Sequence, residues 1–290
     1  MKYTTMAYSA AMTKAIEALF PPGKRLFEDS YSFQILTPPY RMLVNMMKFK
    51  PLFYWLMNLR ERMTPGVVAS LLCRVRYIDE VLSTAIRGGF ETLVNLGSGF
   101  DSRSLRIPGI EALKVFEIDH PAVMEEKRKR LIKTNLGVPP HLFLVPIDFN
   151  TMSLKQGLEN AGYDPAMKTL YLWEGVTQYI SPEAIESTLG YVAQSAPGNR
   201  VVFTYVLKQF VDTPESFTEL KGLVKQFNMM GVQFRSGLEP EKLADYLDRL
   251  GLKLLKDIGS DFYVEQYLKP LKRTPAATKI ERIALAETKA

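Results

Sequence analysis

The chain has 290 residues, of which 47% are hydrophobic and 23% are charged. These proportions are typical of a globular protein with a sizeable core, and they exclude disorder for the bulk of the chain. Lys and Arg number 37 against 31 Asp and Glu, and this small excess, spread along the chain, does not favour nucleic acid as a partner. A single cysteine and two histidines argue against a disulfide framework and a zinc site, so we expect no metal and a reducing, cytoplasmic setting.

The sequence predicts neither an export signal nor a membrane span. Residues 1–18 contain charged side chains and have no continuous apolar segment. Residues 35–59 form the most membrane-like region, but prolines and basic residues interrupt it before it reaches the roughly 18 apolar residues that a span requires. Peripheral contact with a membrane stays open at this point.

Strands and helices are expected to alternate from residue 66 onward. Apolar side chains recur at helical spacing over residues 66–87, which end at a pair of glycines. Ser181 and Pro182 are typical of the N-cap and first turn of another helix. The predicted strands are residues 92–96, 114–119, 142–147, 169–173 and 200–206; further helices are expected at 121–133 and 239–250, and two more strands among 252–258, 261–267 and 280–287.

This alternation predicts an α/β fold. Short apolar strands separated by helices favour a parallel sheet that is covered on both faces. Such sheets bind ligands at the carboxyl ends of their strands. Residues 1–65 and 208–237 fall outside the alternation, and we expect both segments to cover that edge of the sheet as a cap and a lid.

A glycine turn follows the first predicted strand. Residues 94–103 read Val-Asn-Leu-Gly-Ser-Gly-Phe-Asp-Ser-Arg, and Asp119 ends the next strand, 20 residues after Gly99. Glycines let the backbone approach a ligand closely, and an acid at this place accepts hydrogen bonds from both ribose hydroxyls. A dinucleotide site would have a third glycine where Ser102 stands. An adenosine cofactor without phosphates fits better, and S-adenosylmethionine is such a molecule.

Two further carboxylates follow strands of the predicted sheet. Asp148 comes directly after the third strand and Glu174 directly after the fourth. Either one alone could be a helix cap or a solvated loop end. Four consecutive strands that end in glycine or an acid favour a polar site at one edge.

Three motifs resemble those of a known family. Residues 93–103 (LVNLGSGFDSR), 116–121 (FEIDHP, followed by EKR at 126–128) and 173–179 (WEGVTQY) are similar to successive motifs of the leucine carboxyl methyltransferase family. That family also includes bacterial proteins assigned as S-adenosylmethionine-dependent methyltransferases and polyketide carboxyl methyltransferases. The resemblance covers roughly residues 10–205. It implies a Rossmann-like class I methyltransferase fold, with a seven-stranded, mostly parallel sheet in the order 3-2-1-4-5-7-6.

The resemblance also implies how the chain is organised and which residues bind the cofactor. We expect one domain over 1–290, with an N-terminal helical cap (1–65), a cofactor-binding core (66–207), a lid insertion (208–237) and C-terminal strands that complete the sheet (238–290). Arg76 is an alternative to Arg74, and Arg106 is expected to be a structural ion-pair partner. The implied cofactor-binding residues are Gly97, Ser98 and Gly99 at the methionine part, Asp119 at the ribose, Asp148 and Phe149 at the adenine, Glu174 at the amino-acid or ribose end, and Lys14 and Arg74 at the cofactor carboxylate.

The expected activity is S-adenosylmethionine-dependent O-methylation of a carboxylate on a small, partly apolar molecule. A carboxylate is already ionised at pH 7 and needs no general base, so we assign no catalytic residue. A phenol or enol acceptor would need a base. The candidates for it are His120, His141, Tyr31 and Tyr179, although His120 is better explained as the cap of the helix that opens at Pro121.

Other interpretations compete with this one. Met42, Met46, Met47, Phe49, Phe53, Tyr54, Trp55 and Met57 form an apolar cluster that is either an acceptor pocket or core and lid packing. Arg41, Lys48, Lys208 and Arg235 are either cations for an acidic substrate or solvated surface charges. A non-catalytic cofactor-binding or partner-binding protein and an NAD-dependent oxidoreductase are the alternative functions. A hydrolase is excluded because the chain has no Gly-x-Ser-x-Gly elbow.

Overall fold

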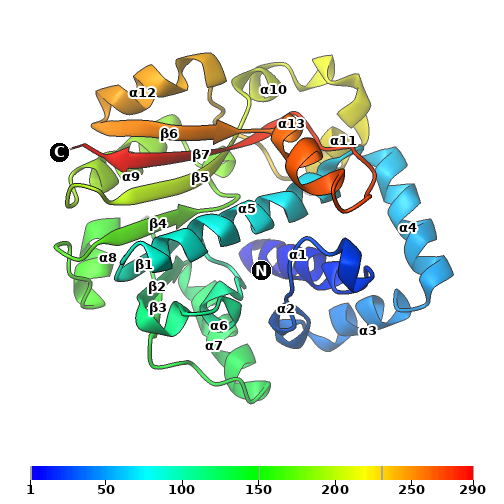
Figure 1. The fold of residues 1–290 in the computed structure, drawn as a ribbon, viewed down its shortest axis with the longest axis horizontal. Helices are drawn as coiled ribbons and strands as arrows, with labels where there is room; N and C mark the ends of the chain where they lie inside the picture. Colours follow the sequence, from blue (N-terminus) through cyan, green and yellow to red (C-terminus); the bar gives the residue numbers. More distant parts are fainter. Residues whose placement is uncertain (1, 150, 230, 290) are drawn as a thin grey trace.

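The computed structural model describes residues 2–149, 151–229 and 231–289. At its centre is a seven-stranded sheet with the order β3-β2-β1-β4-β5-β7-β6 (Figure 1). The first five strands are parallel, while β7 runs antiparallel to both of its neighbours, so the predicted order and the mostly parallel sheet are confirmed. The strands are β1 (Thr92–Leu96), β2 (Lys114–Asp119), β3 (Leu142–Pro146), β4 (Thr169–Trp173), β5 (Arg200–Val206), β6 (Leu252–Ile258) and β7 (Glu281–Thr288).

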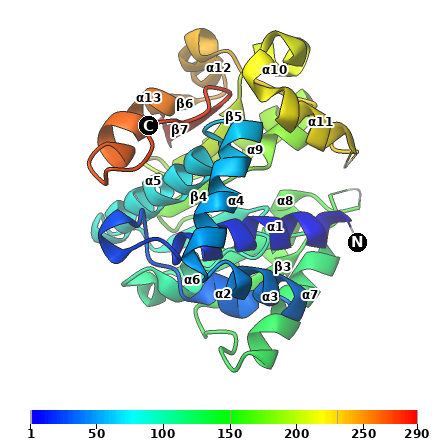
Figure 2. The same cartoon turned by 90° about the vertical axis from the view of Figure 1, so that its right-hand side faces the viewer.

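Helices cover both faces of this sheet. The long α5 (Val67–Arg87) crosses one face, with α7 (Pro121–Lys133) and α13 (Ser260–Tyr263) on the same side, and α9 (Pro182–Ala193) lies on the other face (Figures 1 and 2). Every residue of β1 and β4 is buried, because both of their faces are covered. The remaining helices of the core are α6 (Arg103–Arg106), α8 (Leu154–Asn160) and α12 (Leu243–Arg249), with short helical turns η2 (Ile110–Ala112), η3 (Thr177–Tyr179) and η6 (Pro240–Lys242).

The N-terminal helices lie beyond the carboxyl ends of the parallel strands, at the right of Figure 1. They form their own buried cluster, in which Phe53 and Ile35 are fully enclosed, and Phe100 from the glycine turn joins it. These helices are α1 (Lys2–Glu17), α2 (Tyr31–Ile35), α3 (Pro38–Met46) and α4 (Lys50–Met63), with a turn η1 (Pro22–Lys24). Within the described ranges, none of the helices combines the length and the hydropathy needed to cross a bilayer.

The segment after β5 folds beside α4. It comprises α10 (Lys208–Asp212), η4 (Pro214–Ser216), η5 (Thr218–Leu220) and α11 (Lys221–Met229). Its packing against α4 is close, since a Cβ on Gly222 would lie 2.2 Å from the carbonyl oxygen of Met63. The N-terminal helices, which precede the alternating core, and the segment that follows β5 therefore meet over the same edge of the sheet.

Residues 261–267, one of the three candidate strands at the C-terminal end, are helical. Their span is divided between α13 and the π-helical turn η7 (Val264–Leu268). The reason is the spacing of the buried side chains, because Tyr263, Tyr267 and Leu268 recur at helical intervals rather than at alternate positions. The two remaining candidates form β6 and β7, and the sheet is completed by these two.

Candidate functional site

The glycine turn after β1 has the backbone conformation that its sequence predicts. Gly97 and Gly99 have φ values of +67° and +52°, in the left-handed region that disfavours other residues. The turn is tied to β2 by two hydrogen bonds: Ser98 N donates to the carbonyl oxygen of Ile118 at 2.9 Å, and Gly99 N donates to Asp119 Oδ2 at 2.7 Å. The tips of β1 and β2 are thus held as one rigid unit.

Asp119 stands at the tip of β2 and is partly buried. Its Oδ1 accepts a 2.7 Å hydrogen bond from the backbone N–H of His120, so both carboxylate oxygens are oriented by backbone donors. Burial raises the pKa of Asp119, and the two N–H groups and the charge of Lys127 oppose that rise. Each carboxylate oxygen accepts more than one hydrogen bond, so the side chain retains capacity for two hydroxyl donors.

The Ser98 hydroxyl is a buried polar group inside the turn. The residue is 8% exposed, and its Oγ has no hydrogen-bond partner in the described part of the chain. An unsatisfied buried hydroxyl is costly, and such groups occur where a ligand or water completes the site. This hydroxyl fits a polar ligand that approaches the turn.

Arg74 and Glu174 face each other across the edge of the sheet. Arg74 Nε donates to Glu174 Oε1 at 2.9 Å, and Arg74 Nη1 donates to Glu281 Oε2 at 2.6 Å. Burial alone would raise the pKa of Glu174, but the charges of Arg103, Lys14 and Arg74 outweigh it and lower that pKa to about 2. Arg74 is therefore held between two carboxylates, at the carboxyl end of β4 and the start of β7.

Lys14 and Arg103 extend these contacts into a larger network. Lys14 Nζ lies 3.2 Å from Asp101 Oδ1, and Arg103 Nη1 donates to Asp101 at 2.7 Å and to Glu174 at 2.6 Å. The structure thus joins Lys14 and Arg74 through shared partners, although they are 60 positions apart in the sequence numbering. We define the buried ion-pair network as Arg74, Lys14 and Arg103 with the carboxylates that they contact, which are Asp79, Asp101, Glu174 and Glu281.

Four members of this network, Asp79, Asp101, Arg103 and Glu281, were not singled out from the sequence. Arg103 is fully buried, and the signal for it was its place two residues after Asp101 in the glycine-turn motif. Glu281 had no comparable signal, because it lies far along the chain and reaches Arg74 only when β7 joins the sheet.

The other arginines have different roles. Arg76 points away from the network: it pairs with Glu80 at 3.0 Å and stacks over the ring of Tyr267 at 4.7 Å. The alternative that gave Arg76 the role of Arg74 is therefore not supported. Arg106 pairs with Asp79 at 2.7 Å and is a structural ion-pair partner, as expected.

Asp148 and Phe149 lie on the neighbouring strand end. The loop that carries them is joined to β2, because Ile147 N donates to the carbonyl oxygen of Asp119 at 3.0 Å. Phe149 is 63% exposed, so its ring is accessible at this edge. The strand ends therefore bring the glycine turn, Asp119, Asp148, Phe149 and Glu174 to one edge of the sheet. Arg74 reaches the same edge from α5 through its pair with Glu174, and Lys14 reaches it from α1 through its pair with Asp101.

Helix α1 covers the glycine turn. A Cβ on Gly99 would lie 3.4 Å from Ala7 Cβ, and the ring of Tyr8 packs on Phe100 with centroids 4.4 Å apart. The hydroxyl of Tyr8 also donates a 2.6 Å hydrogen bond to Glu126 on α7. The N-terminal helices are thus anchored directly over the site.

The candidate bases and the apolar cluster are distributed as follows. His120 accepts a hydrogen bond from Ala122 N at 3.2 Å and caps α7, as expected, while His141 Nε2 lies 2.9 Å from the carbonyl oxygen of Ser104.

Of the apolar cluster over residues 42–57, Met47 and Phe53 are buried in the core of the N-terminal helices. Met42, Met46, Phe49, Tyr54 and Trp55 are exposed, so they do not line an enclosed pocket.

Comparison with known proteins places these features in a family. Residues 7–193 match the leucine carboxyl methyltransferase family. The chain is 28% identical over 209 residues to the Bacillus subtilis protein named "Putative S-adenosyl-L-methionine-dependent methyltransferase YktD", covering 71% of this chain and 66% of that one. It is 30% identical over 220 residues to a Mycolicibacterium gilvum protein of the same general name, covering 73% and 69%. The match spans about two thirds of the length of these relatives.

Solved structures share the fold. A protein from Thermobifida fusca, titled a "putative methyltransferase", superposes with a TM-score of 0.57 at 14% identity and covers 90% of this chain and 93% of its own. A DUF574-family protein from Streptomyces avermitilis gives a TM-score of 0.55 at 12% identity, covering 97% of each chain. The family match covers more than half of the residues, and the sheet order agrees with the one that the family implies. The chain belongs to the leucine carboxyl methyltransferase family.

Proposed function

We propose that this protein is an S-adenosylmethionine-dependent O-methyltransferase that methylates a carboxylate of a small, partly apolar molecule in a reducing, cytoplasmic setting. The observation that carries the proposal is the glycine turn, in which the Ser98 hydroxyl has no partner among the described residues and Gly99 N holds the carboxylate of Asp119. The buried ion-pair network adjoins this turn through Asp101. These groups match a ligand that carries hydroxyls and an amino-acid end.

The ribose and adenine of the cofactor have candidate partners along the tips of β2 and β3. Asp119 would accept hydrogen bonds from both ribose hydroxyls, since each of its oxygens accepts one backbone N–H and can accept a further donor. Asp148 would accept from the adenine amino group, and the exposed ring of Phe149 would lie beside the base. Gly97, Ser98 and Gly99 would line the methionine part.

The amino-acid end of the cofactor would meet the buried ion-pair network. Its carboxylate would be attracted to Arg74 and Lys14, and its ammonium to Glu174, whose lowered pKa keeps it ionised. Arg74 already contacts Glu174 and Glu281, so binding would exchange some of these contacts rather than bring a cation out of solvent. Arg74 is already desolvated in the free protein, so binding would not add that cost.

The bound cofactor supplies an electrophilic methyl group on a sulfonium. Gly97, Asp119 and Arg74 would hold the cofactor, and methyl transfer to a carboxylate oxygen of the acceptor would be a displacement in which no proton moves. A carboxylate is ionised at pH 7, so this displacement requires no general base. The task of the chain is then to hold the reacting atoms in line and to exclude water, for which α1 over the glycine turn is suitably placed.

The NAD-dependent alternative is disfavoured by the buried position of Ser102. This residue stands where a dinucleotide site has its third glycine, and its hydroxyl donates a 2.7 Å hydrogen bond to Asp29 in the interior. Its side chain is fully buried, so the backbone there is not open to a pyrophosphate. A non-catalytic binding protein is the second candidate, and turnover distinguishes it from an enzyme.

The test is calorimetric titration of the purified protein with S-adenosylmethionine, S-adenosylhomocysteine and NAD. Micromolar binding of the first two alone supports the cofactor assignment, and binding of NAD alone would overturn it. A screen of apolar carboxylic acids then follows methyl ester formation by mass spectrometry. Cofactor binding without any ester, in a screen that includes phenols, would favour the non-catalytic protein.

A further inference from the structure

The exposed apolar side chains of this protein are concentrated in one segment. Of the 13 large hydrophobic residues that are exposed in the described part of the chain, eight lie between Met42 and Met63. That segment comprises α3, the corner at residues 47–49 and α4. Single exposed hydrophobic residues are ordinary, but a contiguous group of this kind marks an interaction surface.

The exposed residues form one stripe along each helix. On α3 and at its end, Met42, Met46 and Phe49 recur at intervals of four and three residues. On α4, Trp55, Leu59 and Met63 recur at intervals of four, so they lie on one face of the helix. Phe49 directly precedes α4, so the first stripe ends where the helix of the second begins. We call these six residues the corner stripe.

The opposite face of α4 is firmly packed. Phe53 is fully buried and contacts the ring of Phe20 at a centroid distance of 5.0 Å. The end of α4 packs against Gly222 of α11. The helix is thus held in place by one face while Trp55 is 60% and Phe49 66% exposed on the other. The corner stripe is therefore a presented surface and not a loosely packed piece of core.

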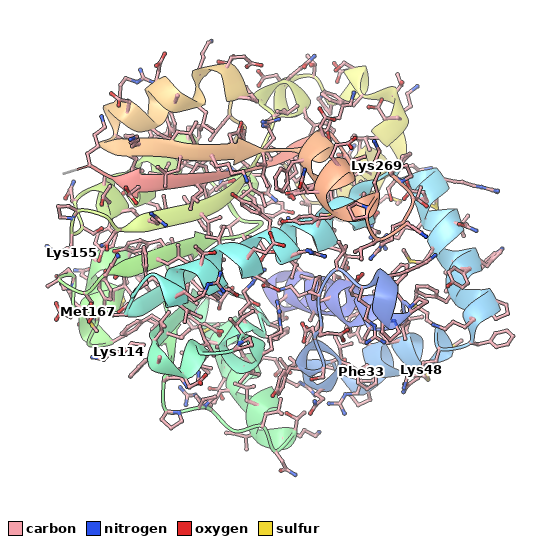
Figure 3. The ribbon with its side chains drawn as sticks, viewed as in Figure 1. Phe33, Lys48, Lys114, Lys155, Met167 and Lys269 are labelled. Carbon is pink, nitrogen blue, oxygen red and sulfur yellow. The ribbon has the colours of Figure 1, made fainter. Side chains whose placement is uncertain are left out.

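The segment that carries the corner stripe has an excess of basic residues. Residues 38–63 contain five basic residues and one acid, a net charge of +4 within a chain whose total is +6. The excess is therefore less evenly distributed than the composition suggested. Figure 3 shows Lys48 at the outer edge of the N-terminal helices, opposite Lys114 and Met167 at the amino ends of the strands, and Lys48 Nζ lies 5.3 Å from the centre of the Phe33 ring. The basic residues are Arg41, Lys48, Lys50, Arg60 and Arg62.

We propose that the corner formed by α3 and α4 docks on a membrane surface that contains anionic phospholipids. Aromatic, Met and Leu side chains flanked by Lys and Arg are the combination that lies in the interfacial region of a bilayer, with the apolar side among the acyl chains and the cations at the phosphates. A second copy of this chain is a poorer occupant. A two-fold symmetric contact would set one surface of charge +4 against another.

The chain carries its own reporter for this contact. Of its two tryptophans, Trp55 lies in the corner stripe and Trp173 is 3% exposed inside the core. Vesicles of phosphatidylcholine with phosphatidylglycerol should shift the emission of Trp55 to shorter wavelength, and lipids brominated on their acyl chains should quench it. Phosphatidylcholine alone should give a much weaker response, and added salt should reduce the response to the anionic vesicles.

Variants separate the contributions of the apolar and the basic side chains to vesicle binding. Trp55→Glu with Leu59→Glu should lower co-sedimentation with anionic vesicles by about tenfold or more, whereas Leu255→Glu, at an exposed site on β6, should leave it unchanged. Lys48→Glu with Arg62→Glu should remove the preference for anionic lipid. Trp55→Phe should abolish the spectral shift while the protein still sediments with vesicles. The unfolding transition of each variant checks that it is folded.

Two results would overturn the proposal. One is the absence of any shift or co-sedimentation with anionic vesicles. The other is a wild-type protein that does not bind vesicles and is a dimer by light scattering, while the variant with Trp55→Glu and Leu59→Glu is a monomer. The corner stripe would then contact a second copy of the chain. Neither result depends on cofactor binding, so the proposal stands or falls separately from the methyltransferase activity.

Discussion

Arg103 Nη1 donates a 2.6 Å hydrogen bond to Glu174 Oε2, and this bond joins the helix after β1 to the residue after β4. The same guanidinium donates to Asp101 at 2.7 Å and, through Nε, to Asp79 at 2.7 Å. Its remaining nitrogen reaches the carbonyl oxygen of Val75 at 3.3 Å. Burial would lower the pKa of Arg103, but its three carboxylate neighbours hold that pKa well above its ordinary value. The glycine turn and Arg74 therefore depend on one fully buried cation.

Replacing Arg103 should destabilise the fold strongly. Arg103→Met keeps much of the volume but leaves three buried carboxylates without their shared partner, so we expect a loss of about 3–5 kcal/mol in the free energy of unfolding. Urea denaturation measures this loss. The matched control is Lys129→Met, which removes an exposed pair with Glu125 and should cost about 0.5 kcal/mol or less. Equal losses in the two variants would contradict the central role of Arg103.

The ionisation of Glu174 predicts a pH dependence of stability. Its pKa falls from 4.5 to about 2 on folding, so its contribution is complete above pH 4.5 and is lost as the pH falls towards 2. The difference in unfolding free energy between the wild type and Glu174→Gln should therefore shrink across that interval. The corresponding difference for Glu125→Gln, on the exposed side of α7, should be small throughout. If the difference in unfolding free energy between the wild type and Glu174→Gln did not change with pH, the lowered pKa of Glu174 would be excluded.

Asp119→Asn should weaken cofactor binding. The substitution keeps an oxygen for one of the two backbone donors, places an NH2 group against the other, and removes the charge that the ribose hydroxyls would contact. We expect a loss of about 1.5–3 kcal/mol in cofactor binding. This corresponds to an increase of roughly tenfold to a hundredfold in the Kd for S-adenosylmethionine, measured by calorimetry. Asp164→Asn is the control at an exposed aspartate. Unchanged affinity in Asp119→Asn would remove the ribose assignment.

Ser98→Ala should have opposite effects on the free and the bound protein. The hydroxyl has no partner in the described structure, so its removal should leave the unfolding free energy unchanged or slightly higher. If the bound cofactor forms a hydrogen bond with this hydroxyl, the binding free energy of the cofactor should be weaker in Ser98→Ala by about 0.5–1.5 kcal/mol. Thermal unfolding with and without S-adenosylhomocysteine measures both quantities. A variant that loses stability in the free state would show that the hydroxyl has a structural partner.

Gly97→Ala should be far more damaging than a glycine substitution elsewhere. A Cβ on Gly97 would lie 2.4 Å from Val176 Cγ2, and the residue has a φ of +67°. Gly198 has a φ of +80° but no atom within 4 Å of such a Cβ, so Gly198→Ala isolates the cost of the backbone conformation. We expect about 1–2 kcal/mol for Gly198→Ala and about 3 kcal/mol or more for Gly97→Ala. Similar losses would mean that Val176 moves aside freely.

The strand pattern and the glycine turn could be predicted because their signals are local. Each of the first five strands is a short apolar run, and Gly97 and Gly99 are the residue type that positive φ values require. The third strand ends at Pro146, one residue before its predicted end. Residues 261–267 were ambiguous, since aromatic residues suit both a strand and a buried helix.

The buried ion-pair network could not be predicted in full because its contacts join distant parts of the chain. Lys14 and Arg74 were identified through the family resemblance, but nothing local indicates that Arg103 connects their partners. Glu281 lies beyond the part of the chain that matches the family, and its partner Arg74 is on α5. The exposure of the corner stripe could not be predicted from the sequence either. Phe49 and Phe53 are the same residue type, and only tertiary packing makes Phe49 exposed and Phe53 buried.

The position of β7 between β5 and β6 has a consequence for synthesis of the chain. On the ribosome, β5 emerges before residues 207–280, and its free edge stays open until β7 follows and inserts beside it. An open edge strand is a template for aggregation. Glu281, the first residue of β7, brings Arg74 its second carboxylate at the same moment. A nascent chain halted before this strand would expose both the β5 edge and an incompletely neutralised arginine, which is the kind of chain that chaperones retain.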